Sequence, residues 1–254
     1  MADTALVTGA SSGIGEQFAR QLAARGHDLI LVARRRDRLE RLAEELPGTS
    51  HVVTCDLSTE AGSLPAKVGE LGAAVDLLVN NAGFGTYGHF VDLDPAREVE
   101  EVRVNCEAVV TLTRAFLPAM VERDRGGVIV VASTAGMQPI PYEATYSASK
   151  AFALNFTEAL SGELRGSGVR VLAVNPGPVP TEWQEIAGHS SVGMVPGEIP
   201  AEQVVRESLQ AYDRGRRSVI PGRTIRWFIR ATAPSPRALQ LRLTERMFGR
   251  GLKR

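Results

Sequence analysis

The sequence predicts an α/β fold, a doubly wound parallel sheet with helices on both faces. Two observations support this. Short apolar segments rich in Val, Leu and Ile recur along the chain, and the segments between them carry apolar residues at helical spacing, as at Ile14, Phe18 and Leu22. Strands that are apolar throughout are typical of a parallel sheet buried on both faces. Right-handed crossovers then give a doubly wound layout, with a ligand expected at the carboxyl ends of the strands.

Seven strands are expected in this sheet. Leu39, Leu42 and Leu46 predict a second helix between the second and third strands. The expected strands cover residues 4–10, 28–34, 51–57, 75–83, 126–134, 169–177 and 217–222.

The composition is that of a globular protein. The chain has 254 residues, of which 44% are hydrophobic and 23% charged, enough to bury a sizeable core. No linker or repeat divides it, so we expect one domain over residues 1–254. It has no apolar run of about 18 residues and no basic segment followed by an apolar core at its start, so we expect a cytoplasmic protein. Cys55 and Cys106 lack metal-binding spacing and are expected to be reduced, space-filling thiols; no metal site is predicted.

A glycine-rich turn follows the first strand. The segment TGASSGIG places Gly9, Gly13 and Gly15 between a strand and a helix. Glycines there let the backbone turn tightly and approach a pyrophosphate, whose charge then lies against the free N–H groups of the helix start. Alternatively, the three glycines serve packing alone.

Arginines follow the second strand, where a nucleotide site would meet the adenosine ribose. An acid at this place selects a free 2′-hydroxyl, whereas an arginine selects a 2′-phosphate. The sequence here is ARRRDR, so Arg34 and Arg35 favour NADP(H) over NAD(H). The alternative is a solvated charge cluster at the start of a helix, although cations there oppose the helix dipole.

Taken together, several motifs resemble the short-chain dehydrogenase/reductase superfamily over residues 5–181. They are TGASSGIG (8–15), NNAG (80–83), Asn105, Ser133, YSASK (146–150) and PGPVPT (176–181). The resemblance implies a single-domain Rossmann-like fold, hydride transfer between NAD(P) and a carbonyl or alcohol carbon, and a homodimer or homotetramer formed through the helices that carry Cys106 and Tyr146.

The resemblance assigns catalysis to Asn105, Ser133, Tyr146 and Lys150. Four residues advance a helix by about 400°, so Tyr146 and Lys150 should share a face, roughly 6 Å apart along the axis. An ammonium group nearby is expected to lower the tyrosine pKa from about 10. The family roles implied are proton transfer by Tyr146, ribose binding by Lys150, stabilisation of the substrate oxygen by Ser133, and a water held by Asn105. YSASK alone could instead be a tightly packed helix.

The same resemblance implies the cofactor-binding residues. Asn81 could instead brace the sheet, because asparagine readily binds local backbone. The expected cofactor contacts are Gly9, Ser11, Ser12, Gly13, Ile14, Gly15, Arg34, Arg35, Asp56, Leu57, Asn80, Ala82, Gly83, Tyr146, Lys150, Pro176, Gly177, Val179 and Thr181.

A lid is expected over residues 182–200, where helical periodicity stops. Its apolar side chains, with others near the site, predict a lipophilic ketone or aldehyde as substrate, although an apolar lid can equally be core. The lid side chains are Trp183, Ile186, Val192, Met194 and Val195, and the others are Phe84, Met137, Ile140 and Tyr142.

The tail is basic. Residues 223–254 hold eight Arg and one Lys against Glu245, a local charge of +8; since the whole chain is at +0, the rest carries −8. Three uses compete: a helix packed on the same chain or a partner subunit, a surface that contacts anionic lipid, or an adaptor for an acidic partner. Pro234 and Pro236 divide the segment and favour packing. No nucleic-acid motif accompanies the charge, so no nucleic acid is expected.

Two functions remain open from sequence. The first is an NADP(H)-dependent oxidoreductase, a carbonyl reductase in the cell; the second is a non-catalytic NADP(H)-binding regulatory protein. Tyr146 and Lys150 at this spacing favour the enzyme, because a pure binder has no need of them.

Overall fold

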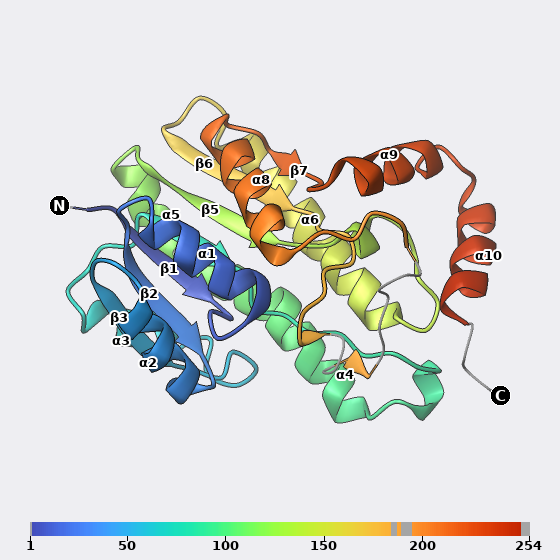
Figure 1. Cartoon of the computed structure of the whole chain (residues 1–254), viewed down its shortest axis with the longest axis horizontal. Coiled ribbons are helices and arrows are strands. Elements are labelled where there is room, and N and C mark those ends of the chain that lie inside the picture. The colour runs from blue at the N-terminus through green and yellow to red at the C-terminus, as the bar shows by residue number, and fades with distance from the viewer. Residues whose placement is uncertain (1, 184–186, 189–194, 250–254) are drawn as a thin grey trace.

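The computed structural model describes residues 2–183, 187–188 and 195–249 and contains a seven-stranded sheet in the order β3-β2-β1-β4-β5-β6-β7, with every neighbouring pair parallel (Figure 1). This confirms the predicted fold class. The strands are β1 (Thr4–Thr8), β2 (Asp28–Ala33), β3 (Ser50–Thr54), β4 (Leu77–Asn80), β5 (Gly126–Val131), β6 (Val169–Val174) and β7 (Ser218–Val219).

Each strand ends earlier than its apolar segment predicted, because the last residues of each segment leave the sheet as loops. The register places Val7 of β1 between Leu31 of β2 and Val79 of β4. Strand order therefore reverses beside β1, and the crevice at the carboxyl ends of β1 and β4 is where an open α/β sheet binds its ligand.

Helices connect the strands and cover both faces of the sheet (Figure 1). The helices are α1 (Gly13–Ala23), α2 (Arg36–Glu45), α3 (Leu64–Gly69), α4 (Pro95–Val102), the π-helical η2 (Arg103–Glu107), α5 (Ala108–Glu122), α6 (Ala144–Glu163), α8 (Ala201–Asp213), α9 (Arg223–Thr232) and α10 (Arg237–Phe248), with 3-10 turns η1 (Phe90–Asp92) and η3 (Thr134–Met137).

The core consists of two apolar layers, one on each face of the sheet. Neighbouring residues of β1 belong to opposite layers. Val7 lies in the same layer as Phe18 of α1 and Leu209 of α8. Leu6 lies in the other layer, with Leu112 of α5. All five of these side chains are fully buried. Two-sided burial explains why the strands are apolar throughout.

The stretch Pro95–Glu122, which runs through α4, η2 and α5, is long and apolar enough to cross a membrane by length and composition, with a mean hydropathy of 1.2. In this fold its buried residues Leu112 and Met120 belong to the layer on one face of the sheet. Packing against the sheet thus accounts for the buried part of this apolar stretch.

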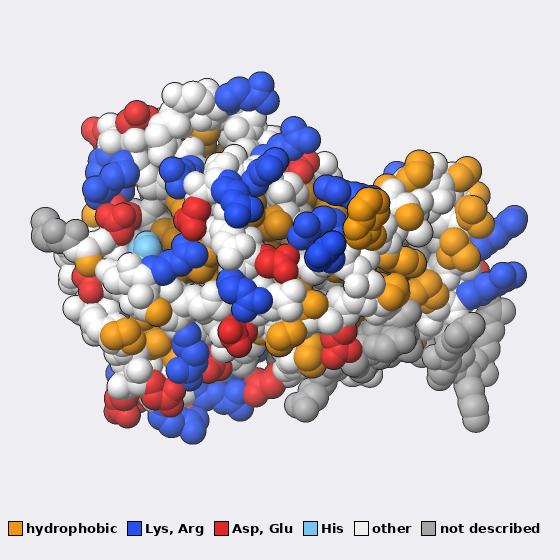
Figure 2. Space-filling model, turned by 45° about the horizontal axis from the view of Figure 1, so that its top comes forward, with side chains coloured by type: hydrophobic (Ala, Val, Ile, Leu, Met, Phe, Trp, Pro, Cys, Tyr) orange, Lys and Arg blue, Asp and Glu red, His pale blue; other side chains and the backbone are white. Residues whose placement is uncertain are grey.

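The basic tail forms α9 and α10, which pack against the rest of the chain. Ile225, Ile229 and Phe248 are buried, and the Thr244 hydroxyl donates a hydrogen bond to the Pro139 carbonyl at 3.2 Å. Of the three uses considered for the tail, packing of its helices on the same chain is therefore the one seen. Its outer face still carries exposed Trp227 beside arginines, and Figure 2 shows hydrophobic side chains gathered on this lobe. Lipid contact stays a prediction.

Candidate active site

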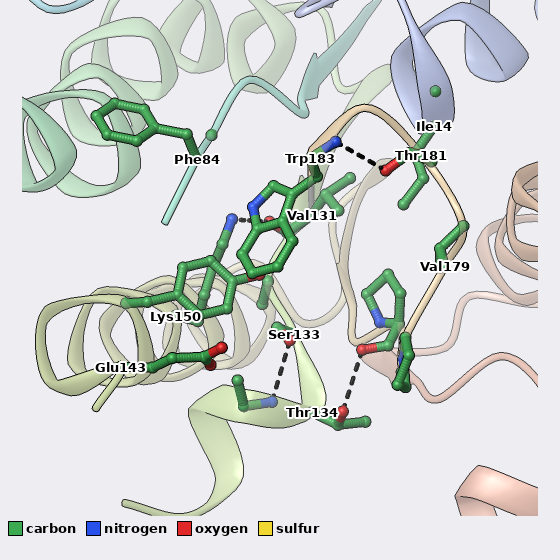
Figure 3. Close-up of a pocket in the computed structure, with 18 of the residues that line it drawn as sticks. Ile14, Phe84, Val131, Ser133, Thr134, Glu143, Lys150, Val179, Thr181 and Trp183 are labelled. Carbon is green, nitrogen blue, oxygen red and sulfur yellow. Dashed lines mark hydrogen bonds between the residues drawn. The ribbon is translucent and has the colours of Figure 1, made fainter. Parts of the chain in front are cut away.

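A cavity of about 660 Å³ opens at the carboxyl ends of the strands. At one end it is lined by the glycine-rich turn after β1, in the middle by Ser133, Tyr146 and Lys150, and at the other end by α9 and α10. Figure 3 shows part of its wall. The cavity thus joins the expected cofactor site to the expected catalytic residues.

The glycine-rich turn has the shape of a phosphate cradle. Gly9 and Gly13 have φ of +67° and +58°, which side-chain-bearing residues rarely adopt. A Cβ on Gly15 would lie 2.2 Å from the Gly9 carbonyl oxygen, so this glycine allows α1 to pack against the turn and does not line the cavity. Ser12, before the first turn of α1, makes no side-chain capping bond. The helix start therefore faces the cavity with a turn that fits a pyrophosphate.

The predicted 2′-phosphate site holds a network of charges. Arg35 contacts Glu182 (Nη1 to Oε2, 2.8 Å) and donates to the Ser12 hydroxyl at 2.9 Å. Arg38 contacts the other Glu182 oxygen at 2.5 Å. Hydrogen bonds from Arg38 and Arg35 lower the pKa of Glu182 to about 2. Arg34 lies 3.5 Å from Glu100 and points to the same cavity.

Arg38 was not predicted as part of the site, and Glu182 was predicted only as the first residue of the lid. Arg38 could have been found, because it follows Arg35 by three residues and so shares a face of the helix that begins there. The pairing with Glu182 has no local signal in the sequence.

Most of the expected cofactor residues line the cavity, but Asn80, like Gly15, does not. The Asn80 side chain is 4% exposed and donates to the Thr113 hydroxyl at 3.0 Å, beneath the site. Its neighbour Asn81 donates to the Thr8 carbonyl at 2.9 Å and so braces β4 against β1, the alternative weighed for it. The expected residues that line the cavity are Gly9, Ser11, Ser12, Gly13, Ile14, Arg34, Arg35, Asp56, Leu57, Ala82, Gly83, Tyr146, Lys150, Pro176, Gly177, Val179 and Thr181.

Three of the four expected catalytic residues meet at the cavity wall. Ser133 follows β5, and its hydroxyl accepts the Ala135 N–H at 3.0 Å and is hydrogen-bonded to Tyr146. Lys150 lies one turn beyond Tyr146 on α6, with its Nζ 5.8 Å from the tyrosine ring centroid, and donates to the Val131 carbonyl at 2.9 Å. The predicted helical face is therefore present.

Asn105, the fourth, lies in the π-helical turn η2 and does not line the cavity. Its side-chain oxygen accepts the Phe84 N–H at 3.2 Å, while its Nδ2 donates to the Phe84 carbonyl at 2.8 Å and to the Ser149 hydroxyl at 2.9 Å. The amide therefore fastens the loop after β4 to α6. There is no room for a side chain at Gly83, because a Cβ there would lie 2.8 Å from the Asn105 oxygen and 3.0 Å from Lys150 Nζ.

The electrostatics of Tyr146 differ from the expectation. Burial and the nearby carboxyl of Glu143 raise the pKa of Tyr146 above its usual value of 10, and the Ser133 hydrogen bond only partly opposes this. The prediction that Lys150 lowers the pKa of Tyr146 is therefore wrong for the ligand-free protein. Lys150 is itself deeply buried, and burial lowers its pKa to about 8. Desolvation is the largest cause of both shifts.

The substrate end is partly as predicted. Phe84, Ile140 and Val195 line the cavity, and the Trp183 ring centroid lies 4.9 Å from that of Tyr146. Met137 does not line it. Ile186, Val192 and Met194 lie outside the described residues.

Tyr142 was expected in the wall of the substrate site and is not there. Its backbone has φ +70°, and its ring packs edge-on against His89 at 5.2 Å between centroids. A Cβ on Gly249 would lie 3.0 Å from the Tyr142 ring, so the ring supports the end of α10. The left-handed backbone turns this side chain away from the cavity.

The tail helices supply a wall that sequence reasoning missed. The side chains come from one face of each helix and are more than 40 residues beyond the last recognised motif. They are Phe228, Ile229, Thr232, Gln240, Leu243, Thr244, Met247 and Phe248. Gln240 holds the turn between the helices, because its Nε2 donates to the Thr232, Ala233 and Ser235 carbonyls.

Comparisons with known proteins agree with this geometry. The profile of the family described as short chain dehydrogenase matches residues 3–190. A short chain dehydrogenase of Pseudocercospora fijiensis is 41% identical over 189 residues, which cover 70% of this chain and 60% of that relative, less than two thirds of its length. The NADP-dependent 3-hydroxy acid dehydrogenase of Escherichia coli is 37% identical over 186 residues, covering 68% of this chain and 71% of the relative. The solved structure of a short-chain dehydrogenase from Sphingobium yanoikuyae in complex with NADPH is 31% identical, with a TM-score of 0.82 over 94% of this chain and 95% of that one.

Proposed function

This chain belongs to the short-chain dehydrogenase/reductase family of oxidoreductases, and on that basis we propose that it transfers hydride between NADP(H) and a lipophilic carbonyl or alcohol substrate. One observation carries the proposal. The hydrogen-bonded hydroxyls of Ser133 and Tyr146, with Lys150 one turn away, lie in the same cavity as the glycine-rich turn.

The residues present fit NADP(H). Gly9, Gly13 and the start of α1 would hold the pyrophosphate, and Arg34 and Arg35 would hold the 2′-phosphate. Asp56, with its pKa lowered by hydrogen bonds from Ser58 despite burial, stays ionised at the adenosine end. NADP(H), when bound, supplies or accepts the hydride.

Tyr146 would be the general acid in the reducing direction. Its raised pKa keeps the phenol protonated at neutral pH, so it can donate a proton to the substrate oxygen. Ser133, hydrogen-bonded to Tyr146, would stabilise charge on that oxygen. Lys150, with a pKa of about 8, can pass a proton to and from the site. NADPH usually supplies reducing power in the cell, which favours carbonyl reduction as the cellular direction.

The substrate end favours an apolar substrate. Phe84, Ile140, Phe228, Leu243 and Met247 all line the cavity. A lipophilic ketone or aldehyde suits such a wall.

We also propose that the protein forms a homo-oligomer through α5 and α6. Val110 on α5 and Phe152 on α6 are exposed, and Phe152 stacks on Phe156 with 5.7 Å between ring centroids. Apolar side chains grouped on a helix face are typical of a subunit interface. The molar mass in solution, measured by light scattering, tests this: a monomer at micromolar concentration contradicts it.

The decisive experiment titrates the purified protein with NADPH and NADH and then follows cofactor oxidation with aldehydes and ketones of graded apolar size. Tyr146→Phe is expected to lower turnover by about 100-fold or more while NADPH affinity stays within about twofold. Turnover that survives this change would contradict the role of Tyr146. Tight NADPH binding without turnover, in either direction, would favour the regulatory protein instead.

A further inference from the structure

Glu143 is a buried acid that the proposed chemistry does not use. It directly precedes α6, three residues before Tyr146, and its side chain is 3% exposed. Asp, Asn, Ser or Thr at this position normally accepts a hydrogen bond from the first turn of the helix, but the longer Glu143 side chain makes no capping bond. Its Oε1 is buried without a hydrogen-bond partner in the described part of the chain.

The carboxyl of Glu143 is instead turned into the cavity. Glu143 is one of the residues that line it, and Figure 3 shows its two oxygens pointing to the same side as Ser133. A buried polar atom without a partner is costly, at about 1–3 kcal/mol, so such an atom at a cavity wall indicates a place for a ligand group.

The surroundings determine the protonation of Glu143. Burial and the carboxyl of Glu101 on α4 raise the pKa of Glu143 to about 8. Tyr146 and Tyr142 flank it in sequence, and Tyr87 interacts with it electrostatically. The buried cation of the site, Lys150, interacts with Glu101 instead. At neutral pH, Glu143 is therefore mostly a neutral carboxylic acid, which both donates and accepts a hydrogen bond.

We propose that Glu143 is a substrate-recognition residue that binds a second oxygen function, a hydroxyl or carbonyl, close to the reacting carbonyl of an otherwise apolar substrate. Hydroxyketones and diketones are then the preferred class. This rests on the proposed function, since the reacting oxygen is placed at Ser133 and Tyr146.

The cavity geometry supports this class of substrate. Glu143 and Ser133 share one side, while Ile140, Phe228 and Leu243 provide apolar walls. A substrate oxygen held at Ser133 brings an adjacent oxygen within the region that Glu143 faces. A purely apolar ketone would leave the carboxyl without a partner, so the site discriminates against it.

The test compares acetophenone with 2-hydroxyacetophenone, which differ by one hydroxyl, in the wild type, Glu143→Leu and Glu143→Gln. The wild type is expected to prefer the hydroxyketone by about tenfold or more in kcat/KM. In Glu143→Leu, kcat/KM should fall by about tenfold more for the hydroxyketone than for acetophenone, so that the preference is lost. Glu143→Gln should retain most of the preference, since the amide still hydrogen-bonds. Equal losses for both ketones in Glu143→Leu would overturn the proposal and leave Glu143 a structural residue.

Glu98 provides a matched control. It is also a buried acid whose Oε1 has no hydrogen-bond partner among the described residues, but its other oxygen accepts a hydrogen bond from the Thr145 hydroxyl and it does not line the cavity. Glu98→Gln should leave the preference between the ketones unchanged. The melting temperature and NADPH affinity of each variant establish that it is folded.

A second readout separates this proposal from the proposed function. Binding of each ketone to the NADPH complex is followed by thermal shift, without turnover. If the wild type reduces neither ketone but binds the hydroxyketone more tightly, with the difference lost in Glu143→Leu, the recognition role holds and the proposed reaction fails. If binding shows no difference between the two ketones in the wild type, the recognition role is overturned.

Discussion

The Glu182 carboxylate lies 2.8 Å from the Arg35 guanidinium. An acid from the segment after β6 therefore forms an ion pair with the arginine that is expected to bind the 2′-phosphate of NADP(H). Arg38 holds the other carboxylate oxygen. A carboxylate and a phosphate compete for the same guanidinium fork. The structure therefore links cofactor binding to the beginning of the proposed lid.

Glu182→Gln should tighten NADPH binding, because an amide competes with the phosphate less strongly than a carboxylate. The pair is partly exposed, so we expect a gain of at most about fivefold in Kd, with NADH affinity unchanged. Fluorescence titration with both cofactors measures it. Glu40→Gln is the control, since Glu40 pairs with exposed Arg36 outside the cavity. Weaker NADPH binding in Glu182→Gln would show that Glu182 assists the cofactor.

Arg34→Ala and Arg35→Ala should each weaken NADPH binding by about tenfold or more and leave NADH almost unaffected, because only NADPH carries the 2′-phosphate. The Kd ratio of the two cofactors measures this. Arg36→Ala is the matched control, with the same charge loss one residue further on. An equal loss of affinity for NADPH and NADH would contradict the assignment of Arg34 and Arg35 to the 2′-phosphate.

Leu243→Ala should raise KM for bulky apolar ketones by up to about tenfold, because it removes apolar surface from the cavity wall. Small aldehydes and NADPH should bind as before. Leu241 is similarly exposed, at 42% against 43% for Leu243, but does not line the cavity, so Leu241→Ala should have no effect on KM. Equal kinetics for the two variants would exclude α10 from substrate binding.

The ligand-free protein should become less stable as pH rises from about 5 to 8. Burial raises the pKa of Glu101 to about 7 and that of Glu143 to about 8. In the unfolded chain both ionise near 4.5, so within this window the folded state binds more protons and rising pH favours unfolding.

The melting temperature as a function of pH measures this effect. The double variant Glu101→Gln, Glu143→Gln cannot titrate at these sites and should show a flatter profile over the same window. The wild-type slope retained in the double variant would contradict the raised pKa values.

The sheet and much of the site could be predicted because their signals are local. Most of the strands are rich in buried apolar residues, and Tyr146 and Lys150 are related by a single helical turn. The direction of the pKa shift of Tyr146 could not be predicted, because it depends on burial and on Glu143 facing the same cavity. Sequence spacing does not fix burial.

Long-range contacts explain the rest of what was missed. The Glu182–Arg35 pair joins residues 147 positions apart, and the Thr244–Pro139 bond joins residues 105 apart. No periodicity relates such residues. The arginines in the tail were visible in sequence, but the apolar faces of α9 and α10 could be assigned to the cavity only once the helices were placed.

The wall built by α9 and α10 has an evolutionary consequence. The family match ends at residue 190, whereas the cavity continues to Phe248. The residues assigned to chemistry thus lie in the matched stretch, whereas part of the substrate wall is encoded in the stretch that follows it. Recombination or mutation in the last quarter of the gene can change which molecules the enzyme accepts without disturbing the residues assigned to cofactor and proton transfer, so substrate range can diverge faster than mechanism.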